Sequence, residues 1–306
     1  YNSSGTKQWT KQTGNPYTNY ALGLVVDPNS NNIYVTGYNK GTLDGQSNSG
    51  DIDIFLIKYN SSGTKQWTRQ TGTSSSDGGR GVEVDSFGNI YVIGWTRGGL
   101  DGSTNAGNTD DIFLMKYNSS GTKQWTKQFG TSSQEEGWDL TVDGSDNLYV
   151  VGYTYGGLDG NTNAGVIDFF LVKYNSSGTK QWTKQLGTSS YDYGNDVTTD
   201  SSGNVYVTGY TGGGLDGNTS SGNHDIVLVK YNSSGTKQWT KQLGTSSYDR
   251  GSGVTTDSSG NIYVTGYTKG GLDGNTNSSG SDIFLVKFNS SGTKQWTKQL
   301  GTSSGD

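Results

Sequence analysis

Short runs of alternating apolar and polar residues recur along the chain and predict β-strands. Residues 205–210 (Val-Tyr-Val-Thr-Gly-Tyr) place Val205 and Val207 on one face of a strand and Tyr206 on the other. Residues 225–231 (Asp-Ile-Val-Leu-Val-Lys-Tyr) are apolar at every central position, as expected of a strand buried on both faces. No segment repeats its apolar residues with a helical period. The pattern therefore predicts an all-β protein.

Two more polar runs complete a unit of four strands. Residues 196–200 precede the Ser-Ser-Gly-Asn turn at 201–204, so they form a hairpin with the alternating run. Residues 236–242 (Thr-Lys-Gln-Trp-Thr-Lys-Gln) are polar on both faces and carry two lysines, which suits an exposed sheet edge. We therefore expect this strand at the outer rim and residues 196–200 next to the axis. Four such strands form a propeller blade.

One string, Tyr-Asn-Ser-Ser-Gly-Thr-Lys-Gln-Trp-Thr, occurs six times with almost no change and defines a repeat. Its copies begin at Tyr1, Tyr59, Tyr117, Tyr174, Tyr231 and Phe288, at intervals of 57 or 58 residues. A steady period of this length indicates a repeat architecture. We predict a single β-propeller array over residues 1–306, whose four-stranded antiparallel blades lie at about 14–71, 72–129, 130–186, 187–243 and 244–300.

The outer-strand sequence has one copy more than the blades require. Residues 1–13 carry it, although the fifth unit has its own copy at residues 294–300, so we predict an extra outer strand. The chain also opens inside a repeat, which suggests a processed or partial product. Three explanations stay open: a segment of a longer propeller, a five-bladed ring with a spare strand, or a strand that joins a neighbouring molecule in a head-to-tail fibre.

The repeated strings resemble a known family. Residues 253–268 (Gly-Val-Thr-Thr-Asp-Ser-Ser-Gly-Asn-Ile-Tyr-Val-Thr-Gly-Tyr-Thr) and residues 282–301 are similar to the SBBP-type β-propeller repeat of bacterial surface and secreted proteins. The resemblance covers essentially the whole chain. It implies a propeller that is extracellular or at the cell surface, and it implies no activity.

Composition narrows the classes of partner. The 20 Tyr and 8 Trp argue for a folded chain, although 50 Gly and only 28% hydrophobic residues would otherwise suggest disorder. The net charge of −5, without a basic face, argues against nucleic acid as a partner. No run is long enough for a membrane helix, so no membrane span is expected. The absence of Cys excludes disulfides and thiol chemistry.

Few residues suggest catalysis. The only histidine, His224, is interpreted as a solvated loop residue. Glu135 and Glu136 are also interpreted as a solvated loop, because a glycosidase acid needs a second carboxylate at a fixed distance. With one His and no Cys, no nucleophile–base pair can be assembled. We therefore predict that the chain is not an enzyme.

The loop between the second and third strands is the candidate metal site. Asp159, Asn161, Asn163 and Asp168 offer oxygen atoms at the alternate spacing of calcium loops, although the Gly lies one place late and the bidentate Glu is missing. A loop stabilised by Asx turns is the alternative, and calcium is the one cofactor suggested. The corresponding acids of the other units are Asp44, Asp53, Asp101, Asp111, Asp216, Asp225, Asp273 and Asp282.

Two further features concern the surface. Asn-Ser-Ser on the predicted turns is an N-glycan acceptor in a competent host, or else hairpin turn chemistry, at Asn2, Asn60, Asn118, Asn175, Asn232 and Asn289. Recurrent aspartates that end the first strand of each unit are expected to cap the turn that follows. Aromatic residues in loops at one end offer stacking platforms for a ligand, namely Trp95, Trp138, Tyr155, Tyr191, Tyr193 and Tyr248.

Nearly identical repeats favour binding or scaffolding. We predict an extracellular structural or adhesive repeat protein that self-assembles into filaments through strand or rim contacts, with itself or surface glycans as partner. The alternative is a carbohydrate- or peptide-binding propeller module of a larger surface protein.

Overall fold

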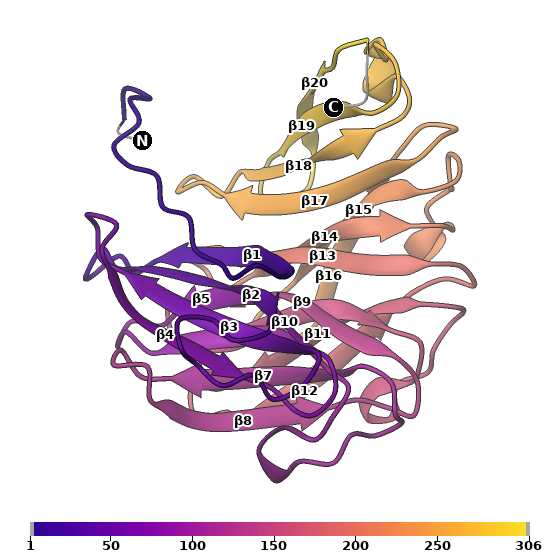
Figure 1. The fold of residues 1–306 in the computed structure, drawn as a ribbon. Helices are drawn as coiled ribbons and strands as arrows, with labels where there is room; N and C mark the ends of the chain where they lie inside the picture. The colour runs from indigo at the N-terminus through magenta and orange to yellow at the C-terminus, as the bar shows by residue number, and fades with distance from the viewer. Residues whose placement is uncertain (1–2, 304–306) are drawn as a thin grey trace. The chain divides into compact units, whose positions relative to one another are not determined.

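The computed structural model describes residues 3–303, and these form five sheets of four antiparallel strands (Figure 1). Each sheet is built from four strands that are consecutive in sequence, with order first-second-third-fourth. The predicted all-β architecture of four-stranded propeller blades is confirmed. We call the five sheets blades 1 to 5.

The strand bounds follow the repeat. Blade 1 contains β1 (Asn19–Val26), β2 (Ile33–Lys40), β3 (Ile52–Tyr59) and β4 (Lys65–Thr71). Blade 2 contains β5 (Asp77–Val84), β6 (Ile90–Thr96), β7 (Asp111–Tyr117) and β8 (Lys123–Phe129). Blade 3 contains β9 (Glu135–Val142), β10 (Leu148–Thr154), β11 (Asp168–Tyr174) and β12 (Lys180–Leu186).

Blades 4 and 5 continue the same order. Blade 4 contains β13 (Asp192–Thr199), β14 (Val205–Thr211), β15 (Asp225–Tyr231) and β16 (Lys237–Leu243). Blade 5 contains β17 (Asp249–Thr256), β18 (Ile262–Thr268), β19 (Asp282–Phe288) and β20 (Lys294–Leu300). Short 3-10 turns precede the third strands of blades 2 to 5: η1 (Leu100–Gly102), η2 (Leu158–Gly160), η3 (Leu215–Gly217) and η4 (Leu272–Gly274).

Glycine sets the close approach of the first two strands in each blade. In blade 4, a Cβ atom on Gly209 would lie 1.8 Å from the carbonyl oxygen of Tyr193 on the neighbouring strand. Only glycine allows that approach. A β-bulge between Gly194 and Asp196 shifts the register at the same level.

Consecutive blades pack through their apolar third strands. In unit 2, Leu228 of β15 packs in one buried cluster with residues of blade 5. These are Val254 of β17, Val264 of β18 and Phe284 of β19. The third strand is thus buried on both faces, as its uninterrupted apolar run predicts.

The fourth strand forms the rim, where its tryptophan covers a turn of the next blade. A Cβ atom on Gly292 would lie 2.9 Å from the ring of Trp239 and 2.8 Å from the side chain of Lys241. The ammonium group of Lys241 lies 5.7 Å from the Trp239 ring centre, so the lysine stem follows the indole as expected.

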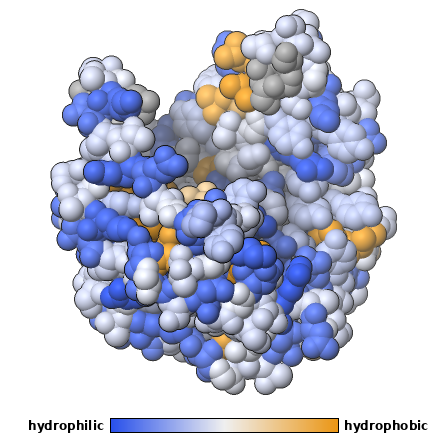
Figure 2. All heavy atoms as spheres, in the orientation of Figure 1, coloured by the Kyte–Doolittle hydropathy of each residue, from blue (hydrophilic) through white to orange (hydrophobic). Residues whose placement is uncertain are grey.

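The chain divides into two compact units, Tyr1–Gly137 and Trp138–Asp306. Unit 1 holds blades 1 and 2, unit 2 holds blades 3 to 5, and the division falls inside β9. The face drawn in Figure 2 is mostly hydrophilic, with hydrophobic residues in a few separate patches. Among the described residues, no helix has the length and apolar character needed to cross a membrane.

The sequence at residues 1–13 predicts an extra outer strand, and its described part does not form one. Residues 3–13 belong to no strand and are drawn as an indigo coil without arrows in Figure 1. An outer strand needs the edge of a third strand as its hydrogen-bonding partner. Unit 1 offers none, because β3 and β7 already pair with β4 and β8.

Candidate functional site

Aromatic side chains gather in unit 2 where the first and second strands of the blades meet. We call the group of Tyr153, Tyr193, Tyr210, His224 and Tyr248 the aromatic surface. Ring centres lie 4.9 Å apart for Tyr153 and Tyr193, and 4.7 Å apart for Tyr193 and Tyr210. His224 lies 4.8 Å from Tyr210 and 4.9 Å from Tyr248. The five rings therefore form a continuous series of contacts across blades 3, 4 and 5.

Strand register explains why these rings meet. Tyr193 and Tyr210 are directly opposite each other in the pairing of β13 with β14. His224 precedes β15 and forms an isolated parallel bridge with Tyr248, which precedes β17. Cross-strand neighbours on one face of a sheet lie within contact distance, so aromatic residues at these positions must stack.

Two cations lie on the aromatic surface. The guanidinium carbon of Arg250 is 4.2 Å from the ring centre of Tyr210, and its Nε donates a hydrogen bond to Nδ1 of His224 at 3.2 Å. The ammonium group of Lys269 is 5.6 Å from the ring centre of Tyr248. Within residues 3–303, neither cation forms a salt bridge with a carboxylate. The surface therefore offers positive charge beside ring faces.

Protonation of the surface follows from its burial. Burial, and secondarily the charge of Arg250, lower the pKa of His224, so the imidazole stays neutral and accepts the arginine hydrogen bond. Burial raises the pKa of Tyr210 to about 12. Tyr210 thus carries no charge near neutral pH, and the positive charge beside it comes from Arg250.

The structure brings most of the predicted stacking residues to this surface. Trp138 and Tyr155 contact Tyr153, at 6.2 and 6.1 Å between ring centres, and Tyr193 and Tyr248 belong to the surface itself. Tyr191 is exposed two residues before Tyr193. Trp95 lies in unit 1, where it is buried and contacts the guanidinium group of Arg97 at 5.7 Å.

Sequence reasoning missed Tyr153, Tyr210 and Arg250, and it placed His224 incorrectly. His224 is half-buried between two tyrosine rings and is not a solvated loop residue. A signal was present, since Tyr153 and Tyr210 occupy the same position in their blades as the predicted Trp95. Aligning the repeats by strand position would have found them.

A second unpredicted feature is a carboxyl pair on the innermost strands of unit 2. Asp139 and Asp196 stand where blade 5 has Gly253, and their side chains form a hydrogen bond with each other. The backbone N–H of Val197 donates to Asp139 at 3.2 Å, and that of Val254 donates to Asp196 at 2.6 Å. Burial, together with the hydrogen bond and charge of Asp196, raises the pKa of Asp139 well above its ordinary value. The pair therefore shares a proton and links three successive blades.

Glu135 and Glu136 are not in a solvated loop, as was expected, but begin β9 and are buried. Glu135 accepts a hydrogen bond from the N–H of Thr131 at 2.7 Å, the same role that Asp77 has toward Thr73 in blade 2. Glu136 forms a salt bridge with Arg80 at 3.0 Å. Glu135 is thus a longer replacement for a recurrent structural aspartate.

The loops predicted to bind calcium use their carboxylates for other contacts. Asp159 binds Lys180 at 2.6 Å and the hydroxyl of Thr183, whereas Asp168 accepts the N–H of Ala164 and the amide of Gln185, each at 2.9 Å. Asn161 donates to the carbonyl of Leu158, and Asn163 accepts the N–H of Gly165.

The corresponding loops of the other blades repeat this arrangement. The first acid of each loop pairs with an outer-strand lysine, at Asp44, Asp101, Asp216 and Asp273. The second acid accepts a loop N–H and a glutamine amide, at Asp53, Asp111, Asp225 and Asp282. In residues 3–303, no three acidic or histidine side chains converge on a metal position. Calcium therefore stays a prediction, without a preformed site.

The glycan acceptor candidates also stabilise turns. The side-chain oxygen of Asn232 accepts hydrogen bonds from the N–H groups of Ser234 and Thr236, at 3.2 and 2.8 Å. Equivalent bonds from the N–H of the threonine four residues later are accepted by Asn60, Asn118, Asn175 and Asn289. Asn2 lies outside the described residues. Asp85 caps its turn as predicted, by accepting the N–H groups of Phe87 and Asn89.

Comparison with known proteins identifies the repeat. The family described as the SBBP β-propeller repeat matches residues 8–42, 66–101, 124–159, 181–216 and 238–273, more than half of the chain. An uncharacterized WD repeat-containing protein of Acanthamoeba polyphaga mimivirus is 25% identical over 96% of this chain and 23% of its own length. The regulatory protein FlaEY of Caulobacter vibrioides is 26% identical over 53% of this chain and 19% of its own length. The chain thus spans less than a quarter of the curated relatives it matches.

Solved structures with a similar fold include enzymes. An ulvan lyase is similar with a TM-score of 0.49 and 13% identity, over 94% of this chain and 72% of the lyase. A gluconolactonase from Xanthomonas campestris is similar with a TM-score of 0.46 and 11% identity, over 96% and 91% of the two chains. These similarities contradict the prediction that the chain is not an enzyme, and we withdraw it. At this identity they concern the fold and assign no reaction to the chain.

Proposed function

Because the chain belongs to the SBBP β-propeller repeat family, we propose that it is an extracellular structural or adhesive repeat protein that joins copies of itself end to end into filaments. The observation that supports this proposal is a pair of apolar faces, one on each terminal blade, made of residues that the internal blades bury. We call them the trailing face of blade 5 and the leading face of blade 1.

The trailing face lies on β19 and β20. Leu285 of β19 is 39% exposed, whereas Leu228, at the same position of β15 in blade 4, is 1% exposed. Ile283 and Leu300 are also exposed. In blade 4 the corresponding third-strand residue, Ile226, is buried against blade 5.

The leading face lies on β1 and the strands beside it. Leu24 of β1 is 66% exposed, whereas Val82, at the same position of β5 in blade 2, is 4% exposed. Val26 is exposed and its counterpart Val84 is buried. In blade 2 these valines belong to the cluster that joins blades 1 and 2, together with Ile54 and Leu56 of β3.

The two faces are the two halves of one kind of interface. Within each unit, the contact between consecutive blades sets a third-strand face, such as Leu56 or Leu228, on a first-strand face, such as Val82 or Val254. Leu285 has no following blade within unit 2 and Leu24 has no preceding blade within unit 1, so blade 5 of a second copy fits blade 1 by the same packing. A contact between two different faces of identical molecules is heterologous and extends into open filaments when it does not close.

Sedimentation velocity across a concentration series tests this proposal. We expect assembly that grows with concentration, and rods in electron micrographs. Leu285→Asp places a charge on the trailing face and should reduce assembly at least tenfold. Thr276→Asp, which adds the same charge to an exposed loop of blade 5, is the matched control and should assemble normally. A chain that stays monomeric at all concentrations, or a Leu285→Asp variant that assembles like the unaltered chain, would refute the proposal.

The aromatic surface supports a second candidate function, recognition of surface carbohydrate that carries carboxylate groups. Sugar rings stack on exposed aromatic faces, and Tyr155, Tyr191 and Tyr248 are exposed at the edge of the buried rings of Tyr153 and Tyr210. Arg250 and Lys269 offer positive charge beside Tyr210 and Tyr248. An acidic polysaccharide satisfies both features, whereas a neutral one uses only the rings.

Calorimetric titration with uronic-acid and neutral oligosaccharides of equal length tests this second function. We expect tighter binding of the acidic ligand, weakening with added salt, and loss of that preference in Arg250→Ala. Arg97→Ala, at an arginine that contacts a tryptophan in unit 1, is the matched control. Equal binding of both ligands, or an acidic preference that survives Arg250→Ala, would contradict it.

A further inference from the structure

Residues 6–12 and residues 293–299 have the same sequence, Thr-Lys-Gln-Trp-Thr-Lys-Gln, and hold different positions in the fold. Residues 293–299 include most of β20, the outer strand of blade 5. Residues 6–12 form no strand and lie against blade 1. The same peptide is therefore present once as an integrated strand and once as a loosely attached segment.

Residues 6–12 contact blade 1 in the way that an outer strand contacts the next blade. The indole Nε1 of Trp9 donates to the carbonyl of Ser61 at 3.3 Å. A Cβ atom on Gly63 would lie 2.8 Å from the Trp9 ring and 3.1 Å from the Lys11 side chain. Gly292 has nearly the same distances to Trp239 and Lys241 of β16. Trp9 therefore occupies the rim position that belongs to the outer strand of a preceding blade.

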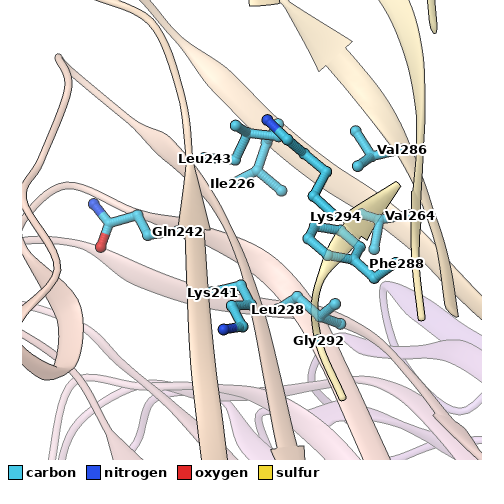
Figure 3. A pocket seen from close by; sticks show the side chains of 10 residues that line it. All are labelled: Ile226, Leu228, Lys241, Gln242, Leu243, Val264, Val286, Phe288, Gly292 and Lys294. Atoms are coloured by element: carbon cyan, nitrogen blue, oxygen red, sulfur yellow. The ribbon is translucent and has the colours of Figure 1, made fainter. Parts of the chain in front are cut away.

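The cavity behind the rim position at blade 1 differs in its lining from the corresponding cavity between blades 4 and 5. Between blades 4 and 5, a cavity of about 160 Å³ is lined by Ile226 and Leu228 of β15, by residues 241–243 of β16, and by Val264, Val286 and Phe288 of blade 5 (Figure 3). Figure 3 shows side chains of the two blades facing each other across it.

At blade 1 the corresponding cavity is larger, about 370 Å³. Lys11, Gln12 and Thr13 line it where residues 241–243 line the internal one, and Val35 and Ile57 replace Val264 and Val286. Among residues 3–303, none stands in for Ile226 and Leu228 in that lining. In the described part of the chain, the leading face thus has an outer segment and no third strand beside that segment.

The attachment of residues 6–12 is weak compared with that of β20. Strand β20 pairs with β19 along its length, from Phe288 opposite Lys294 to Ile283 opposite Leu300. Trp9 is about as exposed as Trp296 of β20, but the described residues around Trp9 make no strand pairing. A second copy that brings β19 and β20 together supplies both the missing third strand and a fully paired outer strand.

We propose that the cavity at blade 1 is the binding site for strands β19 and β20 of a second copy, and that residues 6–12 occupy part of it as a displaceable stand-in. Leu285 and Ile283 of the second copy fill the space that Leu228 and Ile226 fill internally, and its Trp296 replaces Trp9 over Gly63. This inference rests on the end-to-end association proposed above and adds that the N-terminal segment competes with it.

Matched tryptophan variants of the full chain test the competition. Sedimentation equilibrium of Trp9→Ala should show association about tenfold tighter than that of the unaltered chain, because the stand-in is weakened. Trp296→Ala should associate about tenfold more weakly, because the incoming strand loses its ring. Trp182→Ala, at an internal rim position, should lower the thermal midpoint and leave association unchanged. A chain that lacks residues 1–13 should behave like Trp9→Ala, and its circular dichroism reports whether the blades stay folded.

Each outcome has a separate meaning. If Trp9→Ala and the shortened chain associate more weakly, residues 6–12 take part in the interface and the stand-in role is refuted. If both associate with unchanged affinity, no competition exists and the inference also fails. If no variant and no unaltered chain associates at all, the end-to-end association itself is refuted.

Discussion

Leu228 and Leu285 provide a matched pair that measures the effect of an uncovered end on stability. Both are the fourth residue of the third strand in their blades, and they differ in whether a following blade covers them. We predict that Leu228→Ala destabilises the isolated chain much more than Leu285→Ala does, although the two substitutions remove the same atoms.

The magnitude follows from burial. Leu228 is 1% exposed within a cluster that joins blades 4 and 5, so its truncation removes a buried side chain and leaves a cavity, at a cost of about 3 kcal/mol. Leu285 is 39% exposed on an open face, so it loses less buried area and leaves no enclosed cavity, at a cost of about 1 kcal/mol. The expected difference between the two variants is therefore about 2 kcal/mol.

Urea unfolding followed by tryptophan fluorescence is a suitable assay, performed at a protein concentration where the chain is monomeric. The eight tryptophans report on every blade, and midpoints are compared because an array of blades need not unfold in one step. At concentrations where copies associate, the cost of Leu285→Ala should rise toward that of Leu228→Ala, because the face is then covered. Equal costs in the dilute chain would refute the reasoning.

Three further predictions concern single groups. Because folding raises the pKa of Asp139, the stability that this group contributes is present below its unfolded pKa and is lost as pH rises through its folded pKa. Asp139→Asn should therefore be more stable than the unaltered chain at about pH 8, and this advantage should shrink toward about pH 4. Urea titrations at the two pH values measure the difference. Asp196→Asn, which removes the neighbouring charge, should give a similar gain. Adding calcium or a chelator should leave the thermal midpoint unchanged within error, since Asp159 is held by Lys180, and a calcium-dependent rise would show that the loop rearranges around the ion. Asn232→Ala should lower the free energy of unfolding by about 1 kcal/mol through loss of its turn hydrogen bonds, whereas Asn232→Asp should retain most of it.

Much of the fold was predictable because the chain repeats its own local chemistry. The alternation at residues 205–210 and the apolar run at 225–231 each predict a strand, and five copies of that signal remove the ambiguity of a single one. The rim position of the fourth strand also followed from its lysines.

The candidate site was harder to predict because it arises from differences between repeats. Tyr153 and Tyr210 look like ordinary strand residues until the register places them beside Tyr193. The carboxyl pair of Asp139 and Asp196 depends on two blades having aspartate where another has glycine, and the hydrogen bond between them exists only after the blades pack.

The contacts of the loop carboxylates were not predictable for a related reason. The spacing of Asp159 and Asp168 resembles that of metal ligands, but sequence spacing cannot reveal that a lysine and a glutamine of the outer strand contact these groups. The local sequence pattern also could not show whether residues 1–13 form an extra outer strand. Residues 6–12 have the sequence of a strand and lack the neighbouring edge that would make them one.

Cysteine cross-linking between two different variants tests the end-to-end association most directly, because the chain has no cysteine of its own. One variant carries Leu24→Cys on the leading face, and the other carries Leu285→Cys on the trailing face. We predict that an oxidised mixture of the two gives far more disulfide-linked dimer than either variant alone, since only the mixture brings the two positions together across the proposed interface. Equal yields of dimer in the mixture and in the separate variants would contradict the association of blade 5 with blade 1.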